Sequence, residues 1–520
     1  MMLDKIKSPS DLKKLNIQEL KELSYEIRRR IIEVTSETGG HVAPSLGAVE
    51  LAISILKVYN PPTDSIIWDV GHQSYAYKIL TGRNDKFDTL RQYHGLSGFN
   101  KMAESEYDAF GVGHSSTSIS AALGIAYAKR LKEEPGFSIA IIGDGALTGG
   151  MAFEALNHGG DSNLSKFLVI LNDNEMSISK NVGGMQSYMS DFLVSKSYNR
   201  LRRKIWGWTE SMPDKVKHRF IKGTRKLEES VINMLVPNIL FEDLGYKYIG
   251  PVDGHDIPHL VKILDNIRTH MDGPVLLHLV TKKGKGFSLA ELNPDKYHGV
   301  GPYCPKEGIA PKNGNVTWSD VFGSKLCELA EKDNKLIAIT AAMAEGTGLK
   351  EFSEKFPDRF VDVGIAEQHA ITFAGGLAVK GLKPFVAIYS TFMQRAMDQV
   401  IHDIALQKLP VVICMDRAGL VGNDGPTHHG VFDISLFTAI PDIVVMAPSS
   451  AEELEQMMVF AHEYEKGPVA IRYPRGNVCG NDHHIPIKIG KPVLTHEGKS
   501  VVIIGLGEGY NIGKELWEML

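Results

Sequence analysis

The sequence predicts an α/β protein with two successive domains, each built on a mostly parallel sheet flanked by helices. Two observations support this prediction. Helical patterns alternate with short apolar strands from residue 17 to 280, and a second cycle of the same kind begins near residue 336. Such alternation is typical of parallel sheets with helices on both faces. The length of 520 residues agrees, because it corresponds to about two to four domains.

Each predicted strand is a short run rich in Val, Ile, Leu or Phe. These runs are 66–70, 139–142, 167–171 and 275–280 in the first domain, and 336–340, 360–363, 385–389, 411–415 and 443–446 in the second. Helices are predicted between them, among them 366–379 and 393–407. Short apolar runs bounded by turn residues fit buried strands.

Changes in composition predict the domain boundaries. Residues 293–316 and 478–492 read as linkers, so we expect domains at 1–292 and 317–477 and the start of a third unit at 493–520. This last piece holds a strand-like run, VVIIGLG at 501–507, and a helical pattern at 511–520. About thirty residues cannot bury a core alone. We therefore expect either packing on the second domain or a truncated chain.

Composition limits the possible classes of function. A hydrophobic content of 43% and a charged content of 23% are typical of soluble globular proteins, and a net charge of −5 argues against general nucleic-acid binding. Neither a membrane-spanning run nor an N-terminal targeting segment is evident. The four cysteines, Cys304, Cys327, Cys414 and Cys479, lack metal-ligand spacing, which favours reduced thiols in a cytoplasmic protein. The basic segment 196–226 could form a membrane-surface or partner-binding helix, but interspersed acidic residues favour a solvated segment.

The strongest chemical signal lies between residues 139 and 178. The first strand there ends in the sequence GDG at 143–145, and the next ends in NDN at 172–174. Open α/β sheets bind ligands at the carboxyl ends of such strands, and glycines let a phosphate approach backbone N–H groups. Asp144, the Asn174 amide and a backbone carbonyl near Met176 supply the oxygens that Mg²⁺ prefers beside substrate phosphates. The sequence therefore predicts a metal–diphosphate site.

Glu367 is the second chemical candidate. It lies in the first turn of an apolar helix of small residues that follows the strand 360–363. A buried carboxyl tends to keep its proton, which suits it to hydrogen-bond a ring nitrogen. For this residue alone, a carboxylate that complements the helix N-terminus is an equally good interpretation.

Several longer motifs extend these two signals over the chain. The GDG sequence followed by Asn174 resembles the thiamine diphosphate motif. Further motifs are GGHV (39–42), DVGHQ (69–73), VGHSS (112–116), GDGALTGGMAFEALNH (143–158), NDNEMSISKNVGG (172–184), DVGIAEQHA (362–370), YSTFMQRAMDQ (389–399), DRAGLVGNDGPTHHGVFD (416–433) and RYPRG (472–476). With them the chain resembles the 1-deoxy-D-xylulose-5-phosphate synthases, a transketolase-related family. The resemblance implies successive thiamine diphosphate-binding domains and the start of a transketolase C-terminal-like α/β domain.

The resemblance also implies roles for the matching residues. The cofactor residues would be His72, Gly113, His114, Ser115, Gly145, Ala146, Asn174, Lys283, Ile365, Glu367 and Phe392, with Asp144, Asn174 and Met176 on the metal. The substrate residues would be Tyr389, Arg395, Arg417, Asp424, His428 and Arg475. The catalytic residues would be His41, His298, Glu367, Asp424 and His428. Arginine suits a phosphorylated substrate, and histidine suits proton transfer near neutral pH.

The family implies a thiamine diphosphate- and Mg²⁺-dependent reaction. Pyruvate and D-glyceraldehyde 3-phosphate would condense to 1-deoxy-D-xylulose 5-phosphate and carbon dioxide. The sugar phosphate would be a precursor of isoprenoids and thiamine. A homodimer is implied, with neither a nucleic-acid nor a membrane partner. Two alternatives stay open at this point: transketolase-type ketol transfer, and a catalytically silent cofactor-binding protein.

Overall fold

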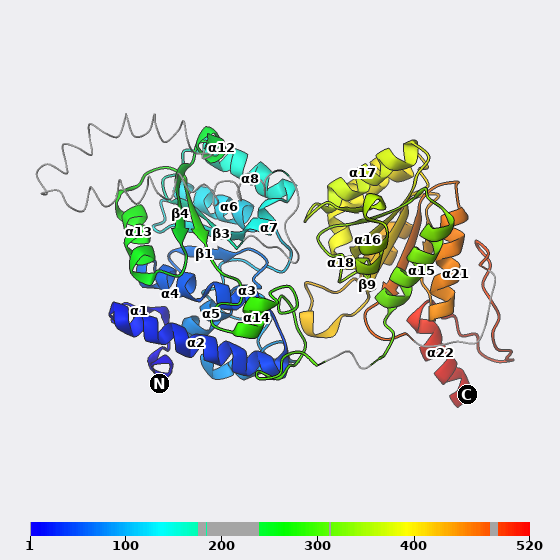
Figure 1. The fold of residues 1–520 in the computed structure, drawn as a ribbon, viewed down its shortest axis with the longest axis horizontal. Coiled ribbons are helices and arrows are strands. Elements are labelled where there is room, and N and C mark those ends of the chain that lie inside the picture. Colours follow the sequence, from blue (N-terminus) through cyan, green and yellow to red (C-terminus); the bar gives the residue numbers. More distant parts are fainter. Residues whose placement is uncertain (1, 175–183, 185–238, 311–313, 479–486) are drawn as a thin grey trace, which may run out of the picture. The chain divides into compact units, whose positions relative to one another are not determined.

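The computed structural model describes residues 2–174, 184, 239–310, 314–478 and 487–520. Within it the chain forms two compact units (Figure 1). The first comprises Met1–Leu90 and Phe99–Pro305, and the second comprises Arg91–Gly98 and Lys306–Leu520. The basic segment 196–226 of the sequence analysis lies outside the described residues.

The first unit is built on a five-stranded parallel sheet in the order β1-β2-β3-β5-β4. Its strands are β1 (Ser65–Trp68), β2 (Ser138–Gly143), β3 (Phe167–Asp173), β4 (Lys247–Asp253) and β5 (Val275–Val280). Strands β1, β2, β3 and β5 are buried along nearly their whole length, as in a sheet covered on both faces. The edge strand β4 was not predicted, because it is half exposed and interrupted by Gly250 and Pro251.

Helices cover this sheet. Alanines and large aliphatic side chains of α6 (Ser118–Leu131) and α8 (Gly150–Asp161) pack on one face of β2 and β3. The unit also contains α1 (Pro9–Leu12), α2 (Ile17–Thr38), α3 (Val42–Gly47), α4 (Val49–Val58), α5 (Tyr75–Lys78), α7 (Asp144–Leu147), α12 (Ile239–Asp243), α13 (Ile257–His270) and α14 (Ser288–Leu292). The longest, α2, begins with a capping box in which the Asn16 side chain accepts from the Glu19 backbone N–H at 3.0 Å.

The second unit is built on a six-stranded parallel sheet in the order β10-β11-β9-β8-β6-β7. Its strands are β6 (Leu336–Thr340), β7 (Phe360–Asp362), β8 (Lys383–Tyr389), β9 (Val412–Ala418), β10 (Val444–Met446) and β11 (Val469–Pro474). The helices are α15 (Trp318–Lys332), α16 (Lys350–Lys355), α17 (Glu367–Val379), α18 (Ser390–Met393), α19 (Met397–Gln399), α20 (Asp433–Thr438), α21 (Ala451–Glu463) and α22 (Glu508–Met519).

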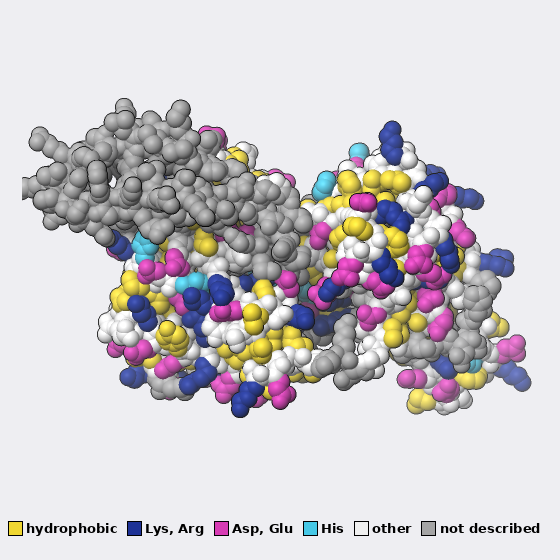
Figure 2. All heavy atoms as spheres, viewed as in Figure 1, with side chains coloured by type: hydrophobic (Ala, Val, Ile, Leu, Met, Phe, Trp, Pro, Cys, Tyr) yellow, Lys and Arg dark blue, Asp and Glu magenta, His cyan; other side chains and the backbone are white. Residues whose placement is uncertain are grey.

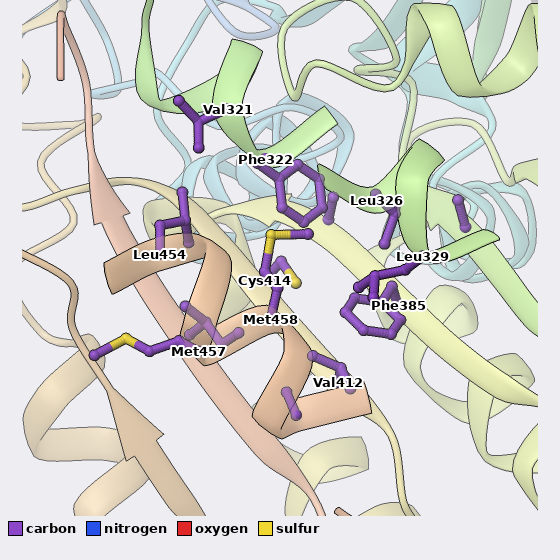
Figure 3. Packing of buried hydrophobic residues seen from close by; sticks show 14 of the residues in the cluster. Val321, Phe322, Leu326, Leu329, Phe385, Val412, Cys414, Leu454, Met457 and Met458 are labelled. Carbon is purple, nitrogen blue, oxygen red and sulfur yellow. The ribbon is translucent and has the colours of Figure 1, made fainter. Parts of the chain in front are cut away.

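Two separate apolar layers hold this second sheet. On one face, α15 and α21 pack against β8, β9 and β11. Figure 3 shows Phe322 of α15 and Met458 of α21 directed toward Cys414 of β9. On the other face, α17 and the segment 400–405 pack against β6, β8 and β9. The predicted class, successive parallel α/β units with flanking helices, is therefore confirmed.

Some predicted elements differ from the structure. The helix expected over 393–407 is not continuous. After α18 ends at Met393, the chain forms a 3₁₀ turn at Gln394–Ala396, the short α19 and a π turn at Val400–Ala405. The predicted strand at 501–507 is wrong, since these residues form no ladder within the described chain, although the helix that follows is formed as α22. Strand β11 was not among the predicted strands. Residues 479–486 of the predicted linker 478–492 lie outside the described residues.

The surface fits the modest net charge of the sequence. Acidic and basic side chains are interspersed over the described part of the face in Figure 2. Among the helices that the structure describes, none has the length and apolar character that crossing a bilayer requires. Cys304, Cys327 and Cys414 are free thiols, and Cys479 lies outside the described residues.

Candidate active site

Three predicted histidines come together in the first unit. The ring centroid of His41 lies 6.0 Å from that of His72 and 6.0 Å from that of His298. The rings of His72 and His298 are stacked with centroids 5.3 Å apart. We call this group the histidine cluster.

The backbone around Gly40 explains how this cluster forms. Gly40 and Val300 exchange two backbone hydrogen bonds of 2.8 and 2.9 Å, which bring His41 beside His298. Gly40 has a φ of +143°, and a Cβ there would lie 2.7 Å from the Tyr75 hydroxyl oxygen, so the position requires glycine. The backbone N–H of His41 donates to that hydroxyl at 3.1 Å.

The pKa values of His72 and Lys283 are both strongly lowered. Burial, together with the charge of Lys283, lowers the pKa of His72 to about 3, so its imidazole is neutral at pH 7. Its Nδ1 makes no hydrogen bond within the described part of the chain. Burial also lowers the pKa of Lys283 to about 8, against the opposing charges of Asp295 and Asp144. A neutral ring and a shielded cation are suited to an anionic ligand.

A buried aspartate shapes the loop that carries Gly113, His114 and Ser115. Asp69, at the end of β1, accepts hydrogen bonds from the backbone N–H groups of Ser116 at 2.7 Å and Ser118 at 3.0 Å. The Ser116 hydroxyl donates to the carbonyl of Ala146 at 2.7 Å. The loop is thereby tied to the segment after Asp144. Sequence reasoning missed Asp69, although its position at the end of a strand was a usable signal.

The predicted metal ligands lie at the ends of neighbouring strands. Strands β2 and β3 pair so that Gly143 is opposite Asn172, which places Asp144 and Asn174 at one edge of the sheet. Asp144 begins α7, and its Oδ1 accepts from the Gly145 N–H at 3.0 Å. The Oδ1 of Asn174 is buried without a hydrogen-bond partner among the described residues. Met176 lies outside them.

These atoms fit a magnesium ion with a diphosphate. A buried oxygen that lacks a donor is destabilising unless a ligand completes it. Mg²⁺ binds hard oxygens and shares its shell with phosphates, which matches one carboxylate and one amide from the protein.

Glu367 is the first residue of α17 in the second unit. Its side chain is almost fully buried, with 4% of the residue exposed. Burial raises the pKa of Glu367, against the weaker lowering effect of Arg395, whose Nη1 donates to Oε2 at 3.4 Å. The carboxyl therefore retains a proton to higher pH than an ordinary glutamate. This favours the hydrogen-bonding role over simple complementation of the helix N-terminus, which needs the ionised form.

Aromatic rings gather beyond the end of β8. Tyr389 and Phe392 stack with centroids 5.7 Å apart, and His428 meets Phe392 edge-on at 5.5 Å. The guanidinium carbon of Arg417 lies 4.1 Å from the centroid of the Tyr389 ring. Four residues predicted from distant motifs are thus brought together.

Asp424 binds arginines with both of its oxygens. Its Oδ2 accepts from Nη1 of Arg475 at 3.0 Å, and its Oδ1 accepts from Nη2 of Arg91 at 2.6 Å. Arg475 also donates to the Val421 carbonyl at 3.0 Å. Arg91 belongs to the second compact unit although it precedes it by two hundred residues in the chain, and the sequence analysis missed it. No local pattern around Arg91 indicated this contact.

The predicted residues therefore form two groups, one in each unit. The first unit holds the histidine cluster, Lys283, the 113–115 loop, and Asp144 to Ala146 with Asn174. The second unit holds Ile365, Glu367, Tyr389, Phe392, Arg395, Arg417, Asp424, His428 and Arg475.

Two family models match the two parts of the chain. A family model described as 1-deoxy-D-xylulose-5-phosphate synthase matches residues 3–281, and one described as Transketolase, pyrimidine binding domain matches residues 314–481. Among solved structures, a transketolase from Campylobacter jejuni is 18% identical with a TM-score of 0.41, covering 90% of this chain and 80% of its own.

Closer similarity is found among curated proteins named 1-deoxy-D-xylulose-5-phosphate synthase. The protein from Syntrophotalea carbinolica is 53% identical over 97% of this chain and 80% of its own length. Those from Oleidesulfovibrio alaskensis and Aquifex aeolicus are each 52% identical, again over 97% of this chain and 80% of their own length. The chain therefore belongs to the 1-deoxy-D-xylulose-5-phosphate synthase family of thiamine diphosphate-dependent transferases.

Proposed function

We propose that the chain catalyses the condensation of pyruvate with D-glyceraldehyde 3-phosphate to 1-deoxy-D-xylulose 5-phosphate and carbon dioxide. The observation that carries this proposal is 52% identity over 97% of the chain to a protein with that synthase name. The relatives support neither transketolase-type ketol transfer nor a catalytically silent role. The reaction breaks the bond between the carboxylate and C2 of pyruvate and joins C2 to the aldehyde carbon. The aldehyde oxygen becomes a hydroxyl, so one proton must be delivered to it.

In this proposal the first unit holds the diphosphate end of thiamine diphosphate. Asp144 and Asn174 would bind Mg²⁺, and a carbonyl near Met176 would complete the protein ligands. Lys283, 5% exposed, would place its charge beside the phosphates, with the 113–115 loop and Gly145 and Ala146 near by. The unpartnered Oδ1 of Asn174 and the buried Lys283 support this assignment. When bound, thiamine diphosphate supplies a carbon nucleophile and an electron sink for loss of carbon dioxide.

The second unit would hold the aminopyrimidine end. Glu367 would share its proton with a ring nitrogen there, because burial raises the pKa of this carboxyl and so favours its protonated form. Phe392 would pack on the ring face, and Ile365 would contact the cofactor from the turn before α17. A carboxyl at a low-dielectric site binds a ring nitrogen more strongly than one in water does.

The arginines would recognise the acceptor. Arg417 and Arg475 present planar donors that match a phosphate group. His41, His298 and His428 are the candidates to move the proton onto the new hydroxyl oxygen, since histidine titrates near neutral pH. The neutral His72 would instead contact the cofactor through its free Nδ1.

A coupled assay tests the proposal directly. The purified chain, with thiamine diphosphate and Mg²⁺, is given pyruvate alone, D-glyceraldehyde 3-phosphate alone, or both, and products are identified by mass spectrometry. We expect 1-deoxy-D-xylulose 5-phosphate and carbon dioxide only with both substrates. Transfer of a two-carbon unit between sugar phosphates without pyruvate would contradict the proposal. Calorimetry with thiamine diphosphate separates failure to bind cofactor from failure to react.

We further infer a cytoplasmic homodimer acting in isoprenoid and thiamine precursor synthesis, as the family implies. Light scattering coupled to size exclusion measures the mass of the assembly. A monomer at micromolar concentration would contradict the dimer.

A further inference from the structure

Three buried polar residues lie in a row across the second sheet. Tyr389 at the end of β8 is the register partner of Asp416 on β9. On β11, Tyr473 belongs to the apolar layer between the sheet and α15, together with Cys414 and Ile471. Asp416 faces the same helix, because it accepts a hydrogen bond from Ser319 of α15. Tyr473 stacks on Phe322 of α15, with ring centroids 5.5 Å apart, so this is the face that α15 covers. We call Tyr389, Asp416 and Tyr473 the polar row.

The polar row is only partly satisfied. Oδ2 of Asp416 accepts a hydrogen bond of 2.7 Å from the Ser319 hydroxyl, in the first turn of α15. Its Oδ1 and the hydroxyls of Tyr389 and Tyr473 have no hydrogen-bond partner in the described ranges. Asp416 itself is fully buried, at 0% exposure. A carboxyl in such a position is destabilising for the fold, so its presence calls for a functional reason.

The adjacent Arg417 supplies that reason. A regular strand would direct Arg417 away from the face that holds Asp416. Instead it has a φ of +58°, which departs from strand geometry, and its guanidinium lies 4.1 Å over the ring of Tyr389. The arginine is therefore held against a ring whose register partner is the buried carboxyl.

Within the polar row, Asp416 is the residue whose charge changes near neutral pH. Burial raises the pKa of Asp416 to about 6, opposed by the Ser319 hydrogen bond and by the charges of Arg417 and Arg475. The other titratable groups facing it are Tyr389 from β8, Cys414 from β9 and Tyr473 from β11, and burial raises the pKa of each. They stay neutral. Arg475 donates to Asp424 at 3.0 Å.

We propose that Asp416, held by Ser319, is a positioning residue for Arg417, whose guanidinium its buried carboxylate keeps on Tyr389 and oriented for the acceptor phosphate. This inference rests on the proposed function, because it takes Arg417 as a phosphate-binding residue. When Asp416 becomes neutral, the attraction that holds Arg417 is lost. Phosphate recognition then weakens, while steps that do not involve the phosphate are unaffected.

The test compares Asp416→Asn with wild type in the full chain loaded with cofactor. The asparagine keeps the shape and removes the charge. At pH 7.5 we expect KM for D-glyceraldehyde 3-phosphate to rise about tenfold, with KM for unphosphorylated glyceraldehyde and kcat changed by less than about threefold. Asp442→Asn, at an exposed aspartate paired with Lys408, is the matched control and should leave all constants unchanged.

The pH dependence separates positioning from a merely structural role. The phosphate of the substrate itself titrates near pH 6, so the informative quantity is the ratio of KM between wild type and variant. The KM of Asp416→Asn for D-glyceraldehyde 3-phosphate, divided by that of wild type, should fall toward one below about pH 6, where Asp416 is neutral in wild type. Ser319→Ala removes the hydrogen bond that stabilises the charge of Asp416. In this variant, the pH at which KM for D-glyceraldehyde 3-phosphate changes should be higher than in wild type by roughly one pH unit. Ser353→Ala on α16, whose hydroxyl bonds only within its helix at 2.6 Å, is its control.

The outcomes are distinguishable. If wild type forms no 1-deoxy-D-xylulose 5-phosphate, the proposed function fails. If wild type is active and Asp416→Asn has the wild-type KM for D-glyceraldehyde 3-phosphate at pH 7.5, the inference on Asp416 is overturned. Should Asp416→Asn not fold, Ser319→Ala decides alone, and an unmoved inflection overturns the inference.

Discussion

Substitution of Glu367 by glutamine isolates the role of one buried proton. The glutamine keeps the volume and can still accept from Arg395, whose Nη1 lies 3.4 Å from Oε2. Its amide N–H can donate a hydrogen bond to a ring nitrogen but cannot transfer the proton to it. Loss of a positioned acid–base group reduces rates by about 10²–10⁴-fold, or about 3–5 kcal/mol. Because Glu367 is only 4% exposed, water cannot readily replace it, and we expect roughly 10³-fold in kcat.

The assay is pyruvate consumption with saturating D-glyceraldehyde 3-phosphate, with cofactor binding followed by calorimetry. Glu351→Gln, at an exposed glutamate on α16 that pairs with Lys355, is the matched control and should keep full activity. Turnover of Glu367→Gln within threefold of wild type, with cofactor bound, would refute the assigned role.

Glu367→Gln should lower activity but raise the stability of the fold at neutral pH. The folded pKa of Glu367 is raised above its ordinary value of 4.5, so the carboxyl's contribution to stability is fully present below pH 4.5 and is lost as pH rises through the folded pKa. Glutamine has no charge to bury. We therefore expect Glu367→Gln to have a higher Tm than wild type at pH 7.5 and no such advantage at pH 4, and a lower Tm at pH 7.5 would contradict this argument.

Three further predictions concern other parts of the two units. Asn174→Ala should weaken Mg²⁺-dependent cofactor binding by about tenfold or more, measured by titrating Mg²⁺ at fixed thiamine diphosphate, and unchanged Mg²⁺ dependence would exclude it as a ligand. Arg475→Ala should reduce the preference for phosphorylated over unphosphorylated glyceraldehyde by about 2 kcal/mol, near the low end for a charge pair because its side chain is 41% exposed; an unchanged preference would assign the phosphate to Arg417 alone. Glu50→Gln should destabilise the first unit by about 3–5 kcal/mol at pH 7. Burial alone would raise the pKa of Glu50, but hydrogen bonds from His255 and Arg28 lower it to about 2, so the stabilisation is present above pH 4.5 and is lost as pH falls toward 2. Urea unfolding at pH 7 and pH 3 measures it, and equal losses at both would contradict the sign.

Local pattern predicted most of the strands because burial on both faces leaves an uninterrupted apolar run. Residues 139–142 and 167–171 correspond to β2 and β3, and 336–340 to β6. The prediction was wrong where packing rather than local pattern decides. The run at 501–507 is apolar but forms no strand, and the residues 393–407 do not form one helix. An apolar run becomes a strand only when a neighbouring strand satisfies its backbone hydrogen bonds.

The candidate site divides in the same way. Asp144, Asn174 and Glu367 could be identified from their positions at the ends of strands or the start of a helix. The side chains that bind the other carboxylates of the site could not be identified from the sequence. Arg91 reaches Asp424 at 2.6 Å from 333 residues away in the chain, and Ser319 of α15 reaches Asp416 of β9 at 2.7 Å.

By itself, the amino-acid sequence determined where strands end, which polar residues follow them and which family the motifs resemble. Only the tertiary structure decided which of those residues are buried and what each one touches. Burial and contact set the lowered pKa of His72 and the raised pKa values of Glu367 and Asp416, because the free energy of a charge depends on its surroundings in three dimensions and not on its neighbours along the chain.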